Sequence, residues 1–393
     1  MFFLFFEQYT RSNDIIFKNF MQRYNEYDET SLLRNRWKER HMKQDTANHK
    51  NSYSHIGNNY QLFGTRHYRL QGGKSDGCRC IDVRTGSGLE YTIVCDRGMD
   101  LSLASFSGIN LVFLTENAEA HPAFYDAGKS EWLRTFSGGL LTTCGPCYLG
   151  DPCEDAGEQL GLHGRFSTIP ASQVCDETDF ESGIIRITGK IIEAYPFGNK
   201  LLIRRTICSS FGSSSITLTD EISNIGGAPA PLTMLYHINF GFPFLDENAR
   251  IHVPSEYCAG YDAYSSDRLQ ERFHMKSPDG SNSEKNFLHT FGEKQDPVSA
   301  WVWNEELLDG IAAYIRFSPH ELPYMTQWML ENIRDYVNAL EPANVPCLPR
   351  SDLRSRGLLP MLEPGQKKQF HLEIGFLHGN ETIRKLLDPD ETS

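Results

Sequence analysis

The sequence predicts an all-β protein, built as one large antiparallel sandwich of two sheets. From about residue 60, short runs rich in β-branched and aromatic residues recur between Gly, Pro, Asn and Asp. Helical periodicity between these runs is nearly absent, which argues against βαβ units and a parallel sheet. The runs show no repeat of fixed period. We therefore expect two sheets packed face to face around a single core.

Two runs show the alternation of a half-buried strand most clearly. In 369–376 four apolar residues alternate with polar ones, and in 215–222 three apolar residues share a face on which Asp220 is the polar exception. Pro364-Gly365 supplies a turn before the last strand, and 381–387 has the pattern of a short amphipathic helix. Similar runs predict strands at 89–95, 111–114, 184–192, 200–208, 298–303, 311–317 and 325–330.

The two ends of the chain differ in composition from the middle. Residues 1–55 are rich in Asn, Lys, Arg, Tyr and Gln and offer little to bury, so we expect a disordered extension with at most a short helix at 14–24. We also consider the hypothesis that Met42 is the true start of translation. The sandwich is expected to span 56–380, and 381–393 to form a tail with a short helix.

The net charge and the hydropathy of the chain argue against some classes of binding partner. Asp and Glu number 51 against 38 Lys and Arg, a net charge of −13. Nucleic acids and anionic membranes reward clustered positive charge, so neither is an expected partner. No segment approaches the roughly 20 apolar residues of a spanning helix. The apolar start lacks the positive residues of an export signal, so we expect a cytoplasmic protein.

The ten cysteines are expected to be free thiols, because the cytoplasm is a reducing compartment. Cys144-x-x-Cys147 with Cys153, and Cys78-x-Cys80, are the spacings closest to a zinc site. No second well-spaced pair completes a set of structural ligands, so buried thiols are the favoured interpretation.

Two histidines and one glutamate have the most informative surroundings. His163 lies in Gly-Leu-His-Gly-Arg-Phe at 161–166, His237 follows the apolar run 232–236, and Glu341 follows the strand-like run 336–340 and precedes Pro342. Imidazole and carboxylate groups are the groups that move protons on and off oxygen near neutral pH. Each also has a purely structural interpretation, such as a core histidine or the end of a strand.

Several words of sequence resemble the aldose 1-epimerase (galactose mutarotase-like) superfamily, and in particular a poorly characterised branch of it. They are Leu-His-Gly-Arg at 162–165, His-x-Asn-Phe at 237–240, Ala-Leu-Glu-Pro-Ala-Asn at 339–344, Cys-Asp-Arg-Gly-Met-Asp-Leu at 95–101 and Glu-Pro-Gly at 363–365. The resemblance covers roughly 60–380. It implies a galactose mutarotase-like β-supersandwich, a small-molecule sugar bound in a cleft on its concave face, and no cofactor or metal.

The resemblance also implies roles in the interconversion of sugar anomers. Glu341 would be the base that takes the proton from the O1 hydroxyl, His237 the acid that protonates the ring oxygen, and His163 a second donor. General acid–base assistance is worth about 10²–10⁴-fold per group, which suffices for a reaction that already proceeds slowly in water.

Four further residues are expected to bind the sugar. Arg97 and Arg165 would hold hydroxyl groups, Asn239 belongs to the His-x-Asn-Phe word, and Trp328 would offer its ring to the apolar side of a pyranose. We expect Arg165 to point to the same side of a strand as His163, two residues earlier. The better-known mutarotases carry an Asn–His pair where this chain has Leu162-His163. Their sugar-binding aspartate is matched only loosely, by Glu256 or Asp262.

Three classes of function are compatible with these residues. The first is a cofactor-free epimerase, and the second is a carbohydrate-binding protein without turnover. The third is a metal-dependent sugar isomerase or lyase, in which His163, His237 and either Glu158 or Glu341 would bind zinc or manganese.

Overall fold

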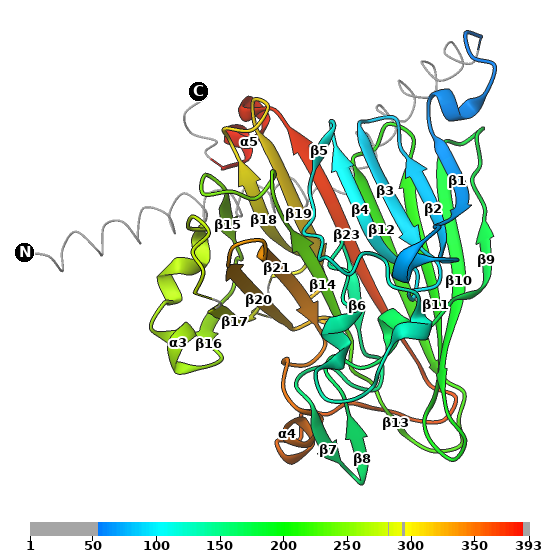
Figure 1. Ribbon diagram of the computed structural model, residues 1–393, viewed down its shortest axis with the longest axis vertical. Coiled ribbons are helices and arrows are strands. Elements are labelled where there is room, and N and C mark those ends of the chain that lie inside the picture. Colours follow the sequence, from blue (N-terminus) through cyan, green and yellow to red (C-terminus); the bar gives the residue numbers. More distant parts are fainter. Residues whose placement is uncertain (1–53, 282, 293–294, 388–393) are drawn as a thin grey trace, which may run out of the picture.

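The computed structural model describes residues 54–281, 283–292 and 295–387, and within them the predicted all-β fold is confirmed (Figure 1). The largest sheet has eight antiparallel strands in the order β15-β18-β19-β23-β12-β11-β10-β9. Their bounds are β9 Ser172–Asp176, β10 Ile184–Ala194, β11 Lys200–Ser210, β12 Ser215–Asn224, β15 Arg250–His252, β18 Val298–Asn304, β19 Ile311–Phe317 and β23 Lys367–His378.

A six-stranded sheet in the order β16-β17-β20-β21-β14-β6 carries the functional candidates. Its strands are β6 Thr142–Cys144, β14 Leu235–Phe240, β16 Tyr257–Gly260, β17 Glu284–Thr290, β20 Tyr324–Glu331 and β21 Tyr336–Ala343. A five-stranded sheet comprises β1 Gly64–Arg69, β2 Arg79–Arg84, β3 Leu89–Val94, β4 Asp100–Phe106 and β5 Ile109–Asn110.

These two smaller sheets form the second layer of the sandwich. Single bridges between Leu101 and Leu141 and between Val112 and Phe240 connect them edge to edge. Figure 1 shows them side by side across the eight-stranded sheet. The core between the layers is one cluster to which all three sheets contribute, for example through Ile93, Ile203 and Phe287.

Short elements complete the chain. Two-stranded ribbons pair β7 Cys153–Asp155 with β8 Glu158–Leu160, and β13 Ala230–Pro231 with β22 Met361–Leu362. The helices are α3 Ala263–Ser266, α4 Arg350–Ser355 and α5 Asn380–Leu387. Single 3₁₀ turns are η1 Asn59–Gln61, η2 Gly73–Ser75, η3 Pro122–Phe124, η4 Glu131–Arg134, η5 Phe166–Thr168 and η6 Leu269–Phe273.

Most of the predicted strands are present with bounds within one or two residues. The run 111–114 is the exception, because it contributes only isolated bridges at Val112 and Leu114 and is not a continuous strand. The amphipathic helix expected at 381–387 is α5. The predicted extension at 1–55, its helix at 14–24 and Met42 lie outside the described residues, apart from residues 54 and 55.

The polar exception in 215–222 has a structural explanation. Asp220 is fully buried and accepts two hydrogen bonds from the guanidinium of Arg205, at 2.9 and 2.7 Å. Arg205 also donates to Asp100 on β4, and Tyr236 on β14 donates to Asp220. A buried charge is tolerated only when it is paired and hydrogen-bonded. The network joins strands of all three sheets, and so fixes how β14 sits against the large sheet.

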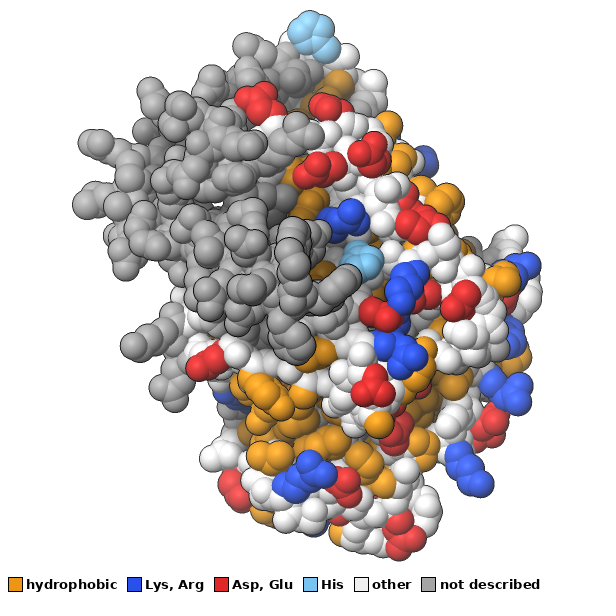
Figure 2. Space-filling view, turned by 90° about the vertical axis from the view of Figure 1, so that its left-hand side faces the viewer, with side chains coloured by type: hydrophobic (Ala, Val, Ile, Leu, Met, Phe, Trp, Pro, Cys, Tyr) orange, Lys and Arg blue, Asp and Glu red, His pale blue; other side chains and the backbone are white. Residues whose placement is uncertain are grey.

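The surface shows no single sign of charge on the face in Figure 2, where acidic and basic side chains are interspersed and hydrophobic side chains gather in its lower half. Among the described residues, no helix is long and apolar enough to span a membrane.

Candidate active site

His237 and Glu341 face each other across two neighbouring strands. The register of β14 and β21 pairs Leu235 with Ala343 and Ile238 with Leu340, which places His237 directly opposite Glu341. Side chains directly opposite each other on an antiparallel pair lie on the same face and in contact. The His237 Nε2 atom accordingly lies 3.3 Å from Glu341 Oε1.

This pair lies on the outer face of the six-stranded sheet, away from the core between the layers. Ile238 and Leu340, which alternate with the pair, belong to the core of the sandwich. Leu235 and Ala343, on the same face as the pair, belong to a second hydrophobic cluster that loops build over the sheet. The pair is nevertheless buried, with 4% of His237 and 2% of Glu341 exposed.

His163 reaches the pair from a turn, and not from a strand as expected. Its backbone has φ of +58°, in the left-handed region that histidine enters more readily than most residues. The His163 amide donates to Gly150 O, and its carbonyl accepts from Gly145 N. Gly164 is required next, because its φ is +74° and a Cβ there would lie 2.2 Å from Tyr148 O. The local sequence thus holds a strained turn that presents the imidazole.

Aromatic rings surround the two histidines. The ring centroids of His163 and His237 are 6.1 Å apart, nearly perpendicular. Trp132 packs edge-on against His163 at 4.8 Å, and Phe136 lies 5.5 Å from His237. Trp328 also lies 5.5 Å from His237, edge-on. The predicted residue Trp328 is therefore part of the cluster, whereas the sequence did not single out Trp132 or Phe136.

Burial shifts the proton affinities of the three candidate catalytic groups. Burial raises the pKa of the Glu341 carboxyl well above its ordinary value, and the nearby Glu284 carboxylate adds to this rise. Burial lowers the pKa of His237 to about 3, with a further contribution from His163. Burial alone lowers the pKa of His163 to about 4. The imidazoles are thus neutral near pH 7, and Glu341 holds a proton more tightly than an exposed carboxyl does.

Several polar atoms of the cluster lack a protein partner of normal hydrogen-bond geometry. Among the described residues, the Nδ1 atom of His163 is buried without a hydrogen bond, and the Nδ1 atom of His237 and the Oδ1 atom of Asn239 lack one of normal geometry, although the Asn239 side chain is close enough to act on the pKa of His237. Asn239 uses its amide nitrogen to donate to Gly139 O and His237 O. Buried polar atoms are nearly always paired, so unpaired ones that converge on one place indicate a binding site.

The two predicted arginines are placed differently from each other. Arg97 is buried and donates to Ala120 O at 2.7 Å, and its contacts do not connect it to the histidines or Glu341. Arg165 is exposed and lies 5.6 Å over the ring of Tyr125, whose hydroxyl donates to Gly164 O. The expectation that Arg165 shares a strand face with His163 is wrong, because this segment is a turn followed by η5.

Two further acidic residues differ from the sequence prediction: one has a structural role away from the cluster, and the other contacts the cluster without having been predicted. Asp262 caps α3 by accepting from Ser265 N, which explains its place in the sequence without a sugar. Glu284 was not predicted, yet its Oε2 accepts a hydrogen bond from Trp328 Nε1 at 2.8 Å. The one sequence feature that could have pointed to Glu284 is its place at the start of a strand in which every second residue is buried.

The metal hypothesis lacks a ligand set in the part of the chain that the structure describes. No group of three or more His, Cys, Asp or Glu there could hold a metal ion. Glu158, one of the acids considered as a ligand, instead pairs with Arg350 at 2.6 Å. All ten cysteines are free, and Cys144 and Cys147 are buried single thiols.

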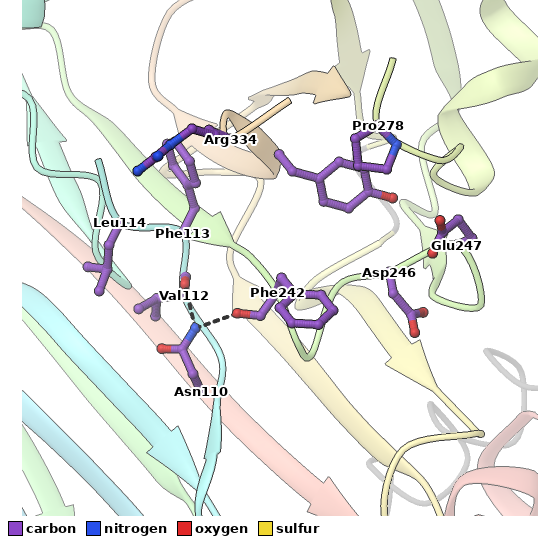
Figure 3. Close-up of a pocket in the computed structure, with 10 residues that line it drawn as sticks. Asn110, Val112, Phe113, Leu114, Phe242, Asp246, Glu247, Pro278 and Arg334 are labelled. Atoms are coloured by element: carbon purple, nitrogen blue, oxygen red, sulfur yellow. Dashed lines mark hydrogen bonds between the residues drawn. The ribbon is translucent and has the colours of Figure 1, made fainter. Parts of the chain in front are cut away.

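A cavity of about 490 Å³ lies beside the cluster without containing it. Asn110, Phe242, Asp246, Glu247 and Arg334 are among its lining residues, and Asn110 donates to the carbonyls of Val112 and Phe242 (Figure 3). Phe113 lines the cavity and also belongs to the hydrophobic cluster of the site. The polar side chains of this cavity do not include His163, His237 or Glu341.

Comparison with known families gives one match over most of the sequence. The pattern of a family described as a domain of unknown function, DUF4432, matches residues 75–376. The chain belongs to the DUF4432 family. A comparison with curated proteins finds no match to this DUF4432 protein.

Solved structures place the DUF4432 fold among galactose mutarotase-like proteins. A candidate aldose 1-epimerase from Klebsiella pneumoniae superposes with a TM-score of 0.78 at 26% identity, over 83% of this chain and 86% of that one. A galactose 1-epimerase from Lactobacillus acidophilus gives 0.56 at 13% identity, over 81% and 99% of the two chains. A galactose mutarotase-like protein from Clostridium acetobutylicum gives 0.56 at 12%, with the same coverage. The predicted resemblance is confirmed, and the last two matches bear on the fold alone.

Proposed function

We propose that this protein binds an aldose over the His163–His237–Glu341 cluster and interconverts its anomers without a cofactor. The observation that supports the proposal is the pairing of His237 with Glu341, 3.3 Å apart and buried on the outer face of the sheet. The name of the Klebsiella protein, a candidate aldose 1-epimerase, points to the same reaction.

The proposed reaction needs one base and one acid. Glu341, once ionised, takes the proton from the O1 hydroxyl of the sugar, and its raised pKa makes it a stronger base than an exposed carboxylate. His237, whose Nε2 lies 3.3 Å from Glu341 Oε1, takes up the proton that Glu341 gives up on ionising. As an imidazolium, His237 then gives this proton to the ring oxygen, and the C1–O5 bond breaks to give the open-chain aldehyde. Rotation about the C1–C2 bond and reversal of the two proton transfers close the ring as the other anomer.

The surrounding side chains would bind and orient the sugar. Beside the acid and base, His163 Nδ1 offers an unpaired hydrogen-bonding atom and Asn239 Oδ1 offers one without a partner of normal geometry. Trp328 offers an indole for the apolar side of a pyranose. Arg165, at the rim beside Tyr125, is proposed to hold an outer hydroxyl. Arg97 has no part in this scheme, because its guanidinium is engaged with Ala120.

Measurement of anomer exchange tests the proposal. Freshly dissolved α-anomers of glucose, galactose, xylose and glucose 6-phosphate are followed by polarimetry and by anomer-resolved NMR. Acceleration above the buffer rate with at least one sugar, sharply lowered in Glu341→Gln, is the expected result. Binding by calorimetry without acceleration would replace the epimerase by a carbohydrate-binding protein. The cytoplasmic location and the absence of nucleic-acid and membrane partners stay predictions from the sequence.

A further inference from the structure

A carboxylate that the proposed reaction does not use stands next to its aromatic platform. Glu284 is the first residue of β17 and is exposed. Its Oε2 accepts a hydrogen bond of 2.8 Å from Trp328 Nε1, the single polar atom of that side chain. Trp328 in turn packs edge-on against His237. Glu284 therefore fixes the ring that contacts the proposed acid.

The sheet register puts Glu284 on the same face as the site. Along β17, Lys285, Phe287 and His289 are buried, so the residues that alternate with them face outward. On the neighbouring strand β20, Trp328 is paired with Asn286 of β17. Thr326, two residues earlier on β20 and therefore on the same face as Trp328, is paired with Glu341 of β21. The exposed carboxylate at the start of β17 therefore lies on the face that carries Trp328 and Glu341.

Among the described residues, Glu284 is the charged group that adds to the effect of burial in raising the pKa of Glu341. The other titratable groups facing Glu341 are neutral at pH 7. They are His237, whose pKa burial lowers to about 3, and Cys144, Cys347 and Tyr261, whose pKa values burial raises. The repulsion between two carboxylates favours the protonated form of the more buried one.

We propose that Glu284 is a positioning residue, which anchors the Trp328 indole against His237 and places a negative charge on the sheet face that carries Glu341. The contact and the charge are features of the free protein; their consequence for catalysis rests on the proposed function. Glu284 thereby holds the sugar platform in place and adds to the raised proton affinity that burial gives to Glu341.

Two substitutions separate the anchor from the charge. Glu284→Gln keeps an oxygen that can accept from Trp328 Nε1 but removes the charge, whereas Glu284→Ala removes both. Glu363→Gln is the matched control, because Glu363 is an exposed carboxylate after β22, on a different sheet. Thermal unfolding of all three variants checks that the fold is intact.

The first measurement needs no sugar. The side-chain carboxyl carbon of Glu341 is followed by ¹³C NMR against pH, and Glu341→Gln assigns its signal. Removing a negative neighbour stabilises the ionised form, so the Glu341 midpoint should move to lower pH in both Glu284 variants and stay unchanged in Glu363→Gln. Unchanged midpoints in both Glu284 variants would overturn the inference.

The second measurement is turnover with a sugar that the wild type accepts. The acidic limb of the kcat/KM profile should move to lower pH in both Glu284 variants. KM should rise roughly fivefold in Glu284→Ala only, the effect of losing one hydrogen bond. A wild type without turnover but with the NMR shift refutes the proposed function and supports Glu284 as the charge on Glu341. Turnover whose acidic limb is the same in all variants refutes the inference alone.

Discussion

Replacing Glu341 by glutamine should sharply lower turnover and at the same time stabilise the protein. Glutamine keeps the shape and the hydrogen-bonding reach of the side chain but cannot take a proton from a sugar hydroxyl. Loss of a general base costs about 10²–10⁴-fold in rate, so kcat should fall by that factor while sugar affinity changes little. His237 and the aromatic rings stay in place, because the substitution adds no volume.

The stabilisation follows from the burial of the carboxyl. Its pKa is raised well above the ordinary value in the folded protein, so the unfolded chain loses this proton at lower pH than the folded one. The buried Glu341 carboxyl therefore does not lower the free energy of unfolding below about pH 4.5. Above that pH it lowers this free energy progressively, until the pH reaches the folded-state pKa of Glu341. The slope is about 1.4 kcal/mol per pH unit for one proton. Glutamine does not titrate, so its advantage over the wild type should be absent at pH 4.5 and clear at pH 7.5.

Urea unfolding at these two pH values and anomer-resolved NMR together test this prediction, with Glu363→Gln as the control. Turnover equal to that of the wild type would end the epimerase assignment. A stability difference that is the same at pH 4.5 and 7.5 would refute the account of Glu341 as a buried carboxyl with raised proton affinity.

Three further predictions concern the same site and its support. His237→Asn should lower kcat like Glu341→Gln, and the double variant should lose much less than the product of the two losses, because both groups act in one step; multiplicative losses would show independent roles. Burial lowers the pKa of His289 to about 3, so the stability that this residue contributes is present above about pH 6.5 and lost as pH falls. In urea unfolding, the stability of His289→Gln relative to wild type should therefore improve between pH 6.5 and 5. A constant difference between the two proteins would contradict this prediction. Gly164→Ala should be destabilised by roughly 2 kcal/mol more than Gly157→Ala, because both have positive φ but only Gly164 lacks space for a Cβ; equal Tm values of the two variants would contradict it.

Local sequence predicted the strands that have one buried face. In β23 and β12, apolar residues occupy every second position, and this alternation is visible without knowledge of the partner strand. Sequence alternation does not predict segments whose strand pairing is irregular. The run 111–114 is apolar enough for a strand, but it pairs only through single bridges, from Val112 to Phe240 on β14 and from Leu114 to Gly138 in a loop, and only the tertiary packing decides that.

The conformation around His163 could not be predicted from periodicity. Gly-Leu-His-Gly predicts a strand, and the expected common face of His163 and Arg165 depends on that prediction. Two backbone positions with positive φ instead reverse the chain, held by contacts with Gly145, Tyr148 and Gly150. These partners come close only in the folded protein. Glycine in a sequence signals such a turn without indicating where the neighbouring side chains point.

The sequence by itself determined the all-β class and most strand positions, and it singled out His163, His237 and Glu341 as candidates, because alternation and short sequence motifs are local properties of a chain. The tertiary structure decided that His237 and Glu341 are opposite each other, that Trp132, Phe136 and Glu284 belong to the same surroundings, and that Arg97 does not. Strand register and the packing of loops over a sheet bring together residues that are far apart in sequence. The shifted pKa values of His163, His237 and Glu341 have the same origin. Burial is the largest cause of all three shifts, and these side chains are buried only once the loops pack over the sheet.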